Sequence, residues 1–331
     1  GVQGMALASS GKTAEALKAY RESIPELIRR DQDDATEEDT GYWRTYWQRV
    51  ILESYLELLA KHNASGSAPA DIDVINESFW VADVARGSGV QEAITATAAR
   101  AQLPDRNLAE LARKDQDGLN RVVAMNRILS GLAASTDARI GKILSEVRAE
   151  IERLRKEHAV MRADIRTRYP EYAELIDPKP AGIGDVRKAL APGEALVSIY
   201  LGESQSYVWT LGGEGKAAFR VIPIKRDEIE ADVQALRRAV DFGEGNVAQI
   251  RPFDLARAHK LYRTFLEPDE ALWKDAQVLN VIPYGARGEL PFSLLVTAPS
   301  PQLPAGAQAA YAEVPWLMRK VAIAQSPSAS A

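Results

Sequence analysis

An apolar repeat in the middle of the chain constrains its fold more than any other feature. It alternates steps of four and three and comprises Ile140, Leu144, Val147, Ile151, Leu154, His158, Met161 and Ile165. This heptad pattern is typical of a helix that packs along a partner helix. Residues 108–132 keep a similar rhythm, which Asp115 and Gly118 interrupt. The sequence therefore predicts an antiparallel helical hairpin over 103–170, with arms about 40 Å long at 1.5 Å per residue.

Residues 1–102 are predicted to be helical. Lys12–Arg30 places its apolar residues on one face at spacings of three and four, and it resembles the second half of a tetratricopeptide repeat. A second helix is expected over 40–61, and shorter helices are expected near 71–86 and 90–101. A helical region of this kind would bind a protein or peptide partner.

The helix expected over 40–61 is rich in aromatic residues, and two interpretations apply to Trp43, Tyr46 and Trp47. Their helical spacing is typical of a core between stacked helices. Alternatively, they line the groove that stacked helical repeats use to bind peptides. The sequence favours the core interpretation and keeps these residues as candidates for partner binding.

The character of the sequence changes after the hairpin. Tyr169-Pro170 ends the second arm, because the residue before a proline is pushed out of helical geometry. Residues 171–184 are predicted to be a linker rich in proline and glycine. Beyond it, β-branched and aromatic runs predict strands at 195–201, 206–211, 217–224, 278–282 and 321–324, with helices near 225–241 and 252–267. This order predicts an α/β sandwich over 185–331.

Composition limits the chemistry that the chain can perform. The formal net charge of −5 argues against nucleic acid as a partner, and no apolar run is long enough to predict a membrane span. We expect a cytoplasmic protein. The absence of cysteine excludes disulfides, thiolate zinc sites and a cysteine nucleophile in this chain. The three histidines lack metal-ligand spacing, so no metal or other cofactor is predicted.

His158 lies on the heptad repeat and has two interpretations. A histidine charges within the physiological pH range, so it could act as a pH switch in a packed seam. A polar residue in a seam can instead fix the register of the two helices, and this interpretation is favoured. His259 is expected to be a surface or capping residue of a helix.

Several short segments of the C-terminal half together resemble the opening half of a CHAT domain, a caspase-like domain often found behind tetratricopeptide repeats in bacteria. They are Val281-Ile282-Pro283-Tyr284-Gly285, Leu290-Pro291-Phe292-Ser293-Leu294-Leu295, Trp316-Leu317-Met318, Val321-Ala322-Ile323-Ala324 and Pro327-Ser328. The resemblance covers residues 185–331. It implies structural roles for Pro283, Gly285, Leu290, Pro291, Phe292, Pro327 and Ser328. Tyr284 departs from the family, many of whose members have aspartate there, which puts the local turn type in doubt.

The resemblance also implies what this chain lacks. CHAT peptidases use a histidine and a cysteine on adjacent parallel strands, and neither is in place here. We therefore expect tetratricopeptide-like helices, a long helical hairpin and an incomplete caspase-like α/β sheet. This would be the scaffold and regulatory part of a cysteine peptidase, inactive alone, with the missing C-terminal half of the domain as a further partner. The alternative is a non-catalytic interaction adaptor with a degenerate α/β module.

Overall fold

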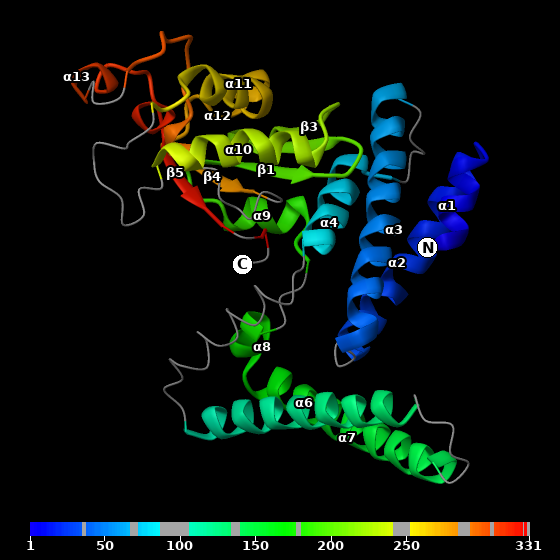
Figure 1. Ribbon diagram of the computed structural model, residues 1–331. Helices are drawn as coiled ribbons and strands as arrows, with labels where there is room; N and C mark the ends of the chain where they lie inside the picture. Colours follow the sequence, from blue (N-terminus) through cyan, green and yellow to red (C-terminus); the bar gives the residue numbers. More distant parts are fainter. Residues whose placement is uncertain are drawn as a thin grey trace. The chain divides into compact units, whose positions relative to one another are not determined.

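A computed structural model shows two compact units. The helical unit comprises Gly1–Leu58 and Gly87–Lys179, and the sheet unit comprises Leu59–Arg86 and Pro180–Ala331 (Figure 1). The described residues are 1–34, 38–66, 72–86, 106–133, 140–176, 180–240, 252–283, 292–304, 308–326 and 328–329. The helix expected over 90–101 lies outside them. Each unit is formed by segments that are separated in the sequence.

Three helices begin the chain: α1 (Val2–Ser9), α2 (Thr13–Asp34) and α3 (Glu38–Ser65). The α1–α2 turn contains Gly11, whose φ of +78° is unfavourable for other residues. Gly4 lets α1 approach α2 closely, because a Cβ there would lie 2.9 Å from the ring of Tyr20. Tyr20 in turn stacks on Tyr55 of α3, with ring centroids 4.8 Å apart. The boundary between the units falls inside α3, after Leu58.

The helical hairpin consists of α6 (Arg106–Ala133) and α7 (Ile140–Arg168), which pack side by side in opposite directions (Figure 1). These bounds coincide with the arms that the heptad pattern predicts. One apolar cluster of the hairpin contains Val122, Ile151 and Leu154. The other contains Leu108, Ala112, Ile165, Tyr172 and Ala173.

The second cluster explains a departure from the predicted linker. Residues 171–176 were assigned to the linker 171–184, but they belong to helix α8 (Pro170–Ile176). Tyr172 and Ala173 are buried against the end of the hairpin, so this segment gains enough apolar contact to stay helical. Pro170 suits the first position of a helix, where its missing N–H is not needed.

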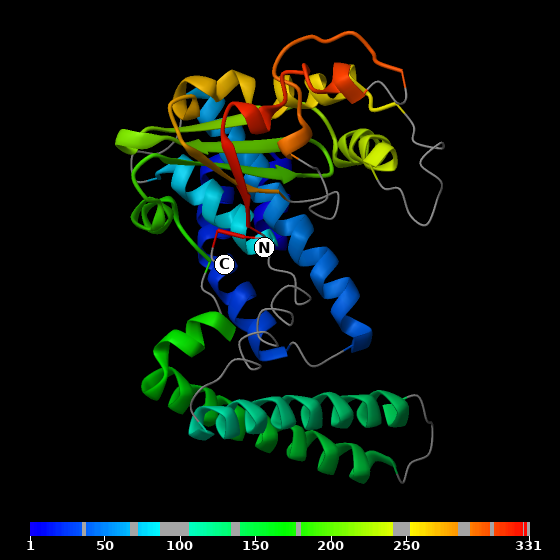
Figure 2. The same ribbon diagram turned by 90° about the vertical axis from the view of Figure 1, so that its left-hand side faces the viewer.

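The sheet unit contains one mixed five-stranded sheet in the order β3-β2-β1-β4-β5. Its strands are β1 (Glu194–Leu201), β2 (Ser206–Leu211), β3 (Ala217–Ile222), β4 (Val278–Ile282) and β5 (Ala322–Gln325). The first three form an antiparallel meander, whereas β4 runs parallel to both β1 and β5. Figure 2 shows β5 in red at one edge of the sheet. The chain is therefore a mixed α/β protein, as the sequence predicts.

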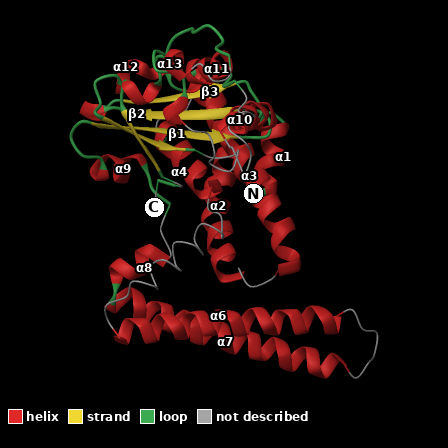
Figure 3. Ribbon diagram, turned by 60° about the vertical axis from the view of Figure 1, so that its left-hand side comes forward, coloured by secondary structure: helices red, strands yellow, loops and turns green. Residues whose placement is uncertain are grey.

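Helices lie on both faces of the sheet (Figure 3). Val197 and Ile199 of β1 point into the larger core, with α10 (Arg226–Val240), α11 (Leu255–Phe265) and α12 (Glu270–Trp273). The alternate residue Ser198 faces α4 (Val74–Arg86), which packs beside α9 (Ile183–Ala189). Shorter elements complete the described part of the unit: η1 (Gly213–Gly215), η3 (Glu267–Asp269), η5 (Phe292–Leu294), α13 (Gln308–Tyr311) and η6 (Leu317–Arg319).

Helix α4 belongs to the sheet unit, although the sequence grouped 71–86 with the N-terminal region 1–102. Its buried face includes Ser78, Phe79, Asp83 and Arg86. Phe79 packs edge-on against Trp209 of β2, with ring centroids 6.1 Å apart. The helix is therefore part of the sheet's packing rather than an extension of the N-terminal helices.

Candidate functional site

The aromatic residues proposed for partner binding lie on α3, and the structure separates them from the core residues of the same helix. Trp47 is 52% exposed, and its ring meets that of Tyr46 edge-on at 5.8 Å. Arg49 lies over the Tyr46 ring at 5.9 Å. Tyr55, two turns further on, is buried. The Trp43 side chain lies outside the described residues. Trp47 is thus exposed beside a half-buried Tyr46 and a cation.

The residues of the CHAT-like motifs are only partly described. Pro283 follows the end of β4 directly, and Phe292 is buried in the large core of the sheet unit. Ser328 accepts a hydrogen bond from Ser326 at its backbone oxygen. Gly285, Leu290, Pro291 and Pro327 lie outside the described residues. Phe292 is therefore a core residue of the sheet unit.

The most elaborate polar site of the sheet unit lies on α4. Asp73 caps the helix by accepting the N–H of Asn76 at 3.1 Å. The Asn76 side chain accepts the N–H of Ile183, at the start of α9, at 2.9 Å. Ser78 accepts the indole N–H of Trp209 at 3.0 Å. These bonds fix one face of α4 to α9 and to β2.

Asp83 and Arg86 lie on the same face of α4, and both are buried. Asp83 Oδ2 accepts the N–H of Ala181, and Oδ1 accepts the N–H of Ala329, both at 3.0 Å. Arg86 Nη2 donates to Ser198 Oγ at 2.5 Å and to the backbone oxygen of Ile199 at 3.2 Å. We call Asp83, Arg86, Ser198 and the N–H groups of Ala181 and Ala329 the α4 clasp.

The two charged side chains of the α4 clasp are almost fully withdrawn from water. Each is 1% exposed, and Arg86 Nη1 lies 3.7 Å from Asp83 Oδ1. Buried charges are tolerated only when they are paired and hydrogen-bonded, because their desolvation costs several kcal/mol for each ion. Two backbone N–H groups bind Asp83, and one serine hydroxyl and one backbone oxygen bind Nη2 of Arg86. The α4 clasp is thus a structural junction of several chain segments.

A second buried polar site interrupts the hairpin. His158 Nε2 lies 2.9 Å from Asp115 Oδ1, and Arg162 Nε donates to the same oxygen at 3.2 Å. We call these three residues the hairpin layer. The Asp115 side chain is 5% exposed, whereas those of His158 and Arg162 are 19% and 28% exposed. Gly118 lies beside the imidazole, and a Cβ there would be 3.4 Å from His158 Cδ2.

The charges of the hairpin layer alter the acidity of its carboxyl group. Burial alone would raise the pKa of Asp115, but contacts with His158 and Arg162 outweigh it and hold the pKa below the ordinary value. Asp115 is therefore ionised near neutral pH and balances the guanidinium of Arg162 opposite it. The favoured interpretation of His158, a polar residue that fixes the register, agrees with this arrangement.

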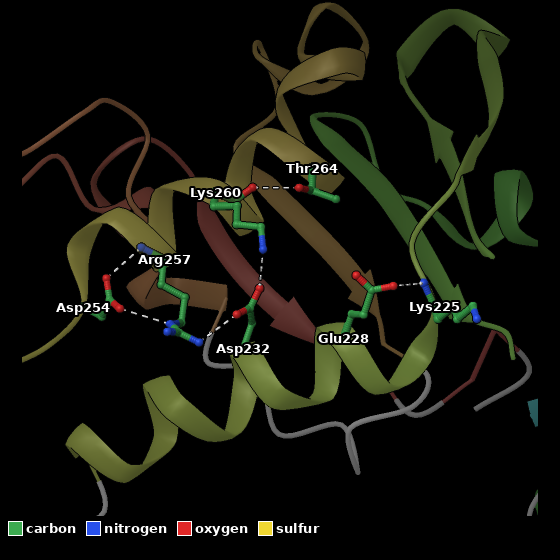
Figure 4. A network of polar contacts seen from close by, with 7 residues as sticks. All are labelled: Lys225, Glu228, Asp232, Asp254, Arg257, Lys260 and Thr264. Atoms are coloured by element: carbon green, nitrogen blue, oxygen red, sulfur yellow. Dashed lines mark hydrogen bonds and ion pairs between the residues drawn. The ribbon is translucent and has the colours of Figure 1, made fainter. Parts of the chain in front are cut away.

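A charged network on the other face of the sheet joins α10 to α11 (Figure 4). Asp232 of α10 accepts bonds from Arg257 at 2.7 Å and from Lys260 at 2.8 Å. Asp254 caps α11 through the N–H of Arg257 at 2.9 Å. His259, on the same helix, has Nδ1 2.9 Å from the backbone oxygen of Val296. This network holds α10 against α11. The contact of His259 with Val296 holds the chain segment after η5 against α11.

The described part of the chain offers no group of histidine, aspartate and glutamate side chains arranged to hold a metal ion. The sequence contains no cysteine at any position. None of the described helices is both long and apolar enough to cross a membrane.

Sequence reasoning missed the α4 clasp but had one signal for it. Asn76, Phe79, Asp83 and Arg86 follow each other at steps of three, four and three, so they share one face of a helix. That face contains a phenylalanine, which marks it as buried, and two opposite charges one turn apart. A buried helical face with an internal charge pair would have been the prediction.

Comparison of the chain with protein-family models, with curated proteins and with solved structures found no match. The motifs of the sequence and the geometry described above therefore carry the function of this chain that is proposed below.

Proposed function

We propose that this chain is the scaffold and regulatory part of a CHAT-family, caspase-like cysteine peptidase, and that its helices bind a protein partner. The observation that carries the binding role is the exposed Trp47 on α3, whose ring meets the half-buried Tyr46 edge-on. Tryptophan and tyrosine dominate the binding energy of many protein interfaces, and a large exposed aromatic surface is unfavourable without a partner.

The packing of the first helices supports a tetratricopeptide-like region. In such repeats, short helices pack closely in pairs and present a surface for peptides. Helices α1 and α2 are joined by a tight turn, and Gly4 allows close contact with Tyr20. The neighbouring α3 adds Tyr55 to the same core and carries the exposed Trp47 two turns away.

The order of the strands supports the CHAT assignment of the sheet unit. An antiparallel meander precedes two strands that run parallel to β1, with helices between them. The first residues of the first CHAT-like motif, Val281 to Pro283, lie at the carboxyl end of β4, the edge where α/β proteins usually place their sites. Without a cysteine, the chain has no thiol nucleophile, so its part in the peptidase would be support and regulation.

The binding role can be tested by site-specific cross-linking. Replacing Trp47 with a photoreactive phenylalanine analogue should give a discrete cross-linked product in a lysate of the source organism. The same analogue at Val160, which is 71% exposed on α7, is the matched control and should not give that product. Tyr46→Ala should reduce the cross-linking from position 47. Equal products from positions 47 and 160 would contradict the proposal.

The peptidase role has a separate test in the coding sequence beyond Ala331. The proposal predicts a His-Gly segment and a Ser-Ala-Cys-like segment on successive strands there. The product of that longer reading frame should react with a cysteine-directed activity probe, whereas the present chain should not. A stop codon directly after Ala331 would instead favour the non-catalytic adaptor.

A further inference from the structure

One carboxylate joins three chain segments that are distant in sequence. Asp83 binds the N–H of Ala181, 98 residues later, and the N–H of Ala329, 246 residues later. Each N–H has its own carboxylate oxygen, and the side chain is 1% exposed. Removal of α4 would therefore deprive both backbone donors of their acceptor at once.

The other bonds of α4 reach different parts of the sheet unit. Asn76 binds the start of α9, Ser78 binds β2, and Arg86 binds β1. Among the hydrogen bonds described for α4, that of Asp83 is the one that reaches the segment after β5. The described hydrogen bonds of Ser78 and Asn76 go to β2 and α9 instead. We therefore expect substitutions at Ser78 or Asn76 to affect that segment by changing how firmly the whole helix is docked.

Helix α4 is also short enough for its order to depend on docking. It has 13 residues, a length at which an isolated helix is only marginally stable in water. Its polar contacts lie on the same face as Phe79, so leaving the sheet would break them together. An element of this kind would couple distant sites if it had a released arrangement besides the docked one.

We propose that α4 is a coupling element of the sheet unit. When α4 is docked, the α4 clasp holds the segment Ser326–Ala329 after β5 and the entry to α9 at Ala181; when α4 is released, both become free. A partner that binds only the released arrangement would shift the equilibrium toward it. This inference is independent of the proposed function, because it needs neither a peptidase nor a ligand of α3.

Hydrogen exchange of the intact chain, measured by mass spectrometry, tests this coupling. Ser78→Ala removes the bond to Trp209 and touches neither Asp83 nor the segment after β5. We expect it to accelerate exchange in 326–329 and at Ala181 about five- to 150-fold, the range for leaving one buried donor without its acceptor. Asn76→Ala should have the same effect, and Asp83→Ala should have a larger one.

The matched control is Thr210→Val on the opposite face of the same sheet. It removes a buried hydroxyl that donates to Asp269 at 3.3 Å, so it weakens the unit without touching α4. Exchange in 326–329 should stay at the wild-type rate in this variant. Equal acceleration by Ser78→Ala and Thr210→Val would show general destabilisation and overturn the inference. So would unchanged exchange at Ala329 in Ser78→Ala, with faster exchange confined to α4.

Discussion

The hairpin layer and the α4 clasp are both buried charged sites, but they differ in what they join. In the hairpin layer, side chains from two neighbouring helices bind one another, and two of the three remain partly exposed. In the α4 clasp, side chains of one helix bind the backbone of remote segments and are closed to water. A side-chain layer can specify the register of two helices. A site in which side chains of one helix bind backbone groups, such as the α4 clasp, specifies which distant segments of the chain come into contact.

This difference predicts opposite responses to apolar replacement. Replacing both partners of a buried ion pair by apolar residues is often neutral or stabilising, whereas removing one partner is costly. The hairpin layer should follow this rule, because its members can be replaced together. The α4 clasp should not, because the N–H groups of Ala181 and Ala329 cannot be removed with their acceptor.

The largest effect is expected for Arg86→Met, which leaves Asp83 as an uncompensated buried charge. The sheet unit should lose about 3–5 kcal/mol of unfolding free energy. Urea unfolding can be followed by tryptophan fluorescence after Trp43 and Trp47 are changed to phenylalanine. The four remaining tryptophans then all lie in the sheet unit: Trp80, Trp209, Trp273 and Trp316.

Two further variants complete this measurement. Arg263→Met breaks an ion pair with Glu267 in which the arginine is 65% exposed, and it should change the midpoint little. Asp83→Leu combined with Arg86→Met should remain destabilised, because each orphaned N–H costs about 1–3 kcal/mol. Recovery of wild-type stability in the double variant would contradict this prediction, because it would mean that the α4 clasp behaves like an ordinary buried ion pair.

A gain in stability is expected when Asp115 and His158 are both changed to leucine. This change restores the apolar repeat, and Arg162, already 28% exposed, can turn into water. Protection against hydrogen exchange in α6 and α7 should rise by about 1–4 kcal/mol. Asp115→Leu alone should not reproduce the gain, and a loss of protection in the double variant would contradict the comparison.

Acid should weaken the hairpin through Asp115. Its pKa is lowered in the folded chain relative to the ordinary value of 3.8, so the carboxylate stabilises the fold above that pH. This contribution is lost as the pH falls from 3.8 through the folded pKa. Thermal melts of wild type and Asp115→Asn should therefore converge in acid. A stability difference that grows as the pH falls would refute this role of the carboxylate.

The smallest effect concerns Gly118. An alanine methyl there would lie 3.4 Å from His158 Cδ2 and 3.9 Å from Met161 Cε, which are ordinary contacts. Gly118→Ala should stabilise the hairpin by up to about 1 kcal/mol, because glycine is a poor helix former. In the sheet unit, Gly212→Ala should destabilise, since its methyl would collide with the backbone oxygen of Leu272. Melting of both variants checks the contrast, and a loss of stability in Gly118→Ala or a gain in Gly212→Ala would refute it.

The regular elements could be predicted from the sequence because their signals are local. The heptad repeat gives both arms of the hairpin, and β-branched runs give the strands. Even the partner of Asp115 was within reach, since an antiparallel register with Leu108 opposite Ile165 places Asp115 opposite His158. The prediction instead treated Asp115 as an interruption of the pattern.

Long-range features escaped prediction for a physical reason. Helix α4 looks like its neighbours in the chain, and only its partners in β1, α9 and the segment after β5 assign it to the sheet unit. Helix α8 was missed because Tyr172 is buried by residues of the hairpin rather than by its own neighbours. The exposure of Trp47 beside the buried Tyr55 also depends on which helices pack against α3.

The discontinuity of the sheet unit has a consequence during protein synthesis. Helix α4 leaves the ribosome long before its partners, because the hairpin is translated between them. At about 5–20 residues per second, the 246 residues between Asp83 and Ala329 take roughly 10–50 s to synthesise. During that time the charged face of α4 has no sheet to bind, so a chaperone that covers it would act on the nascent chain before the unit can close.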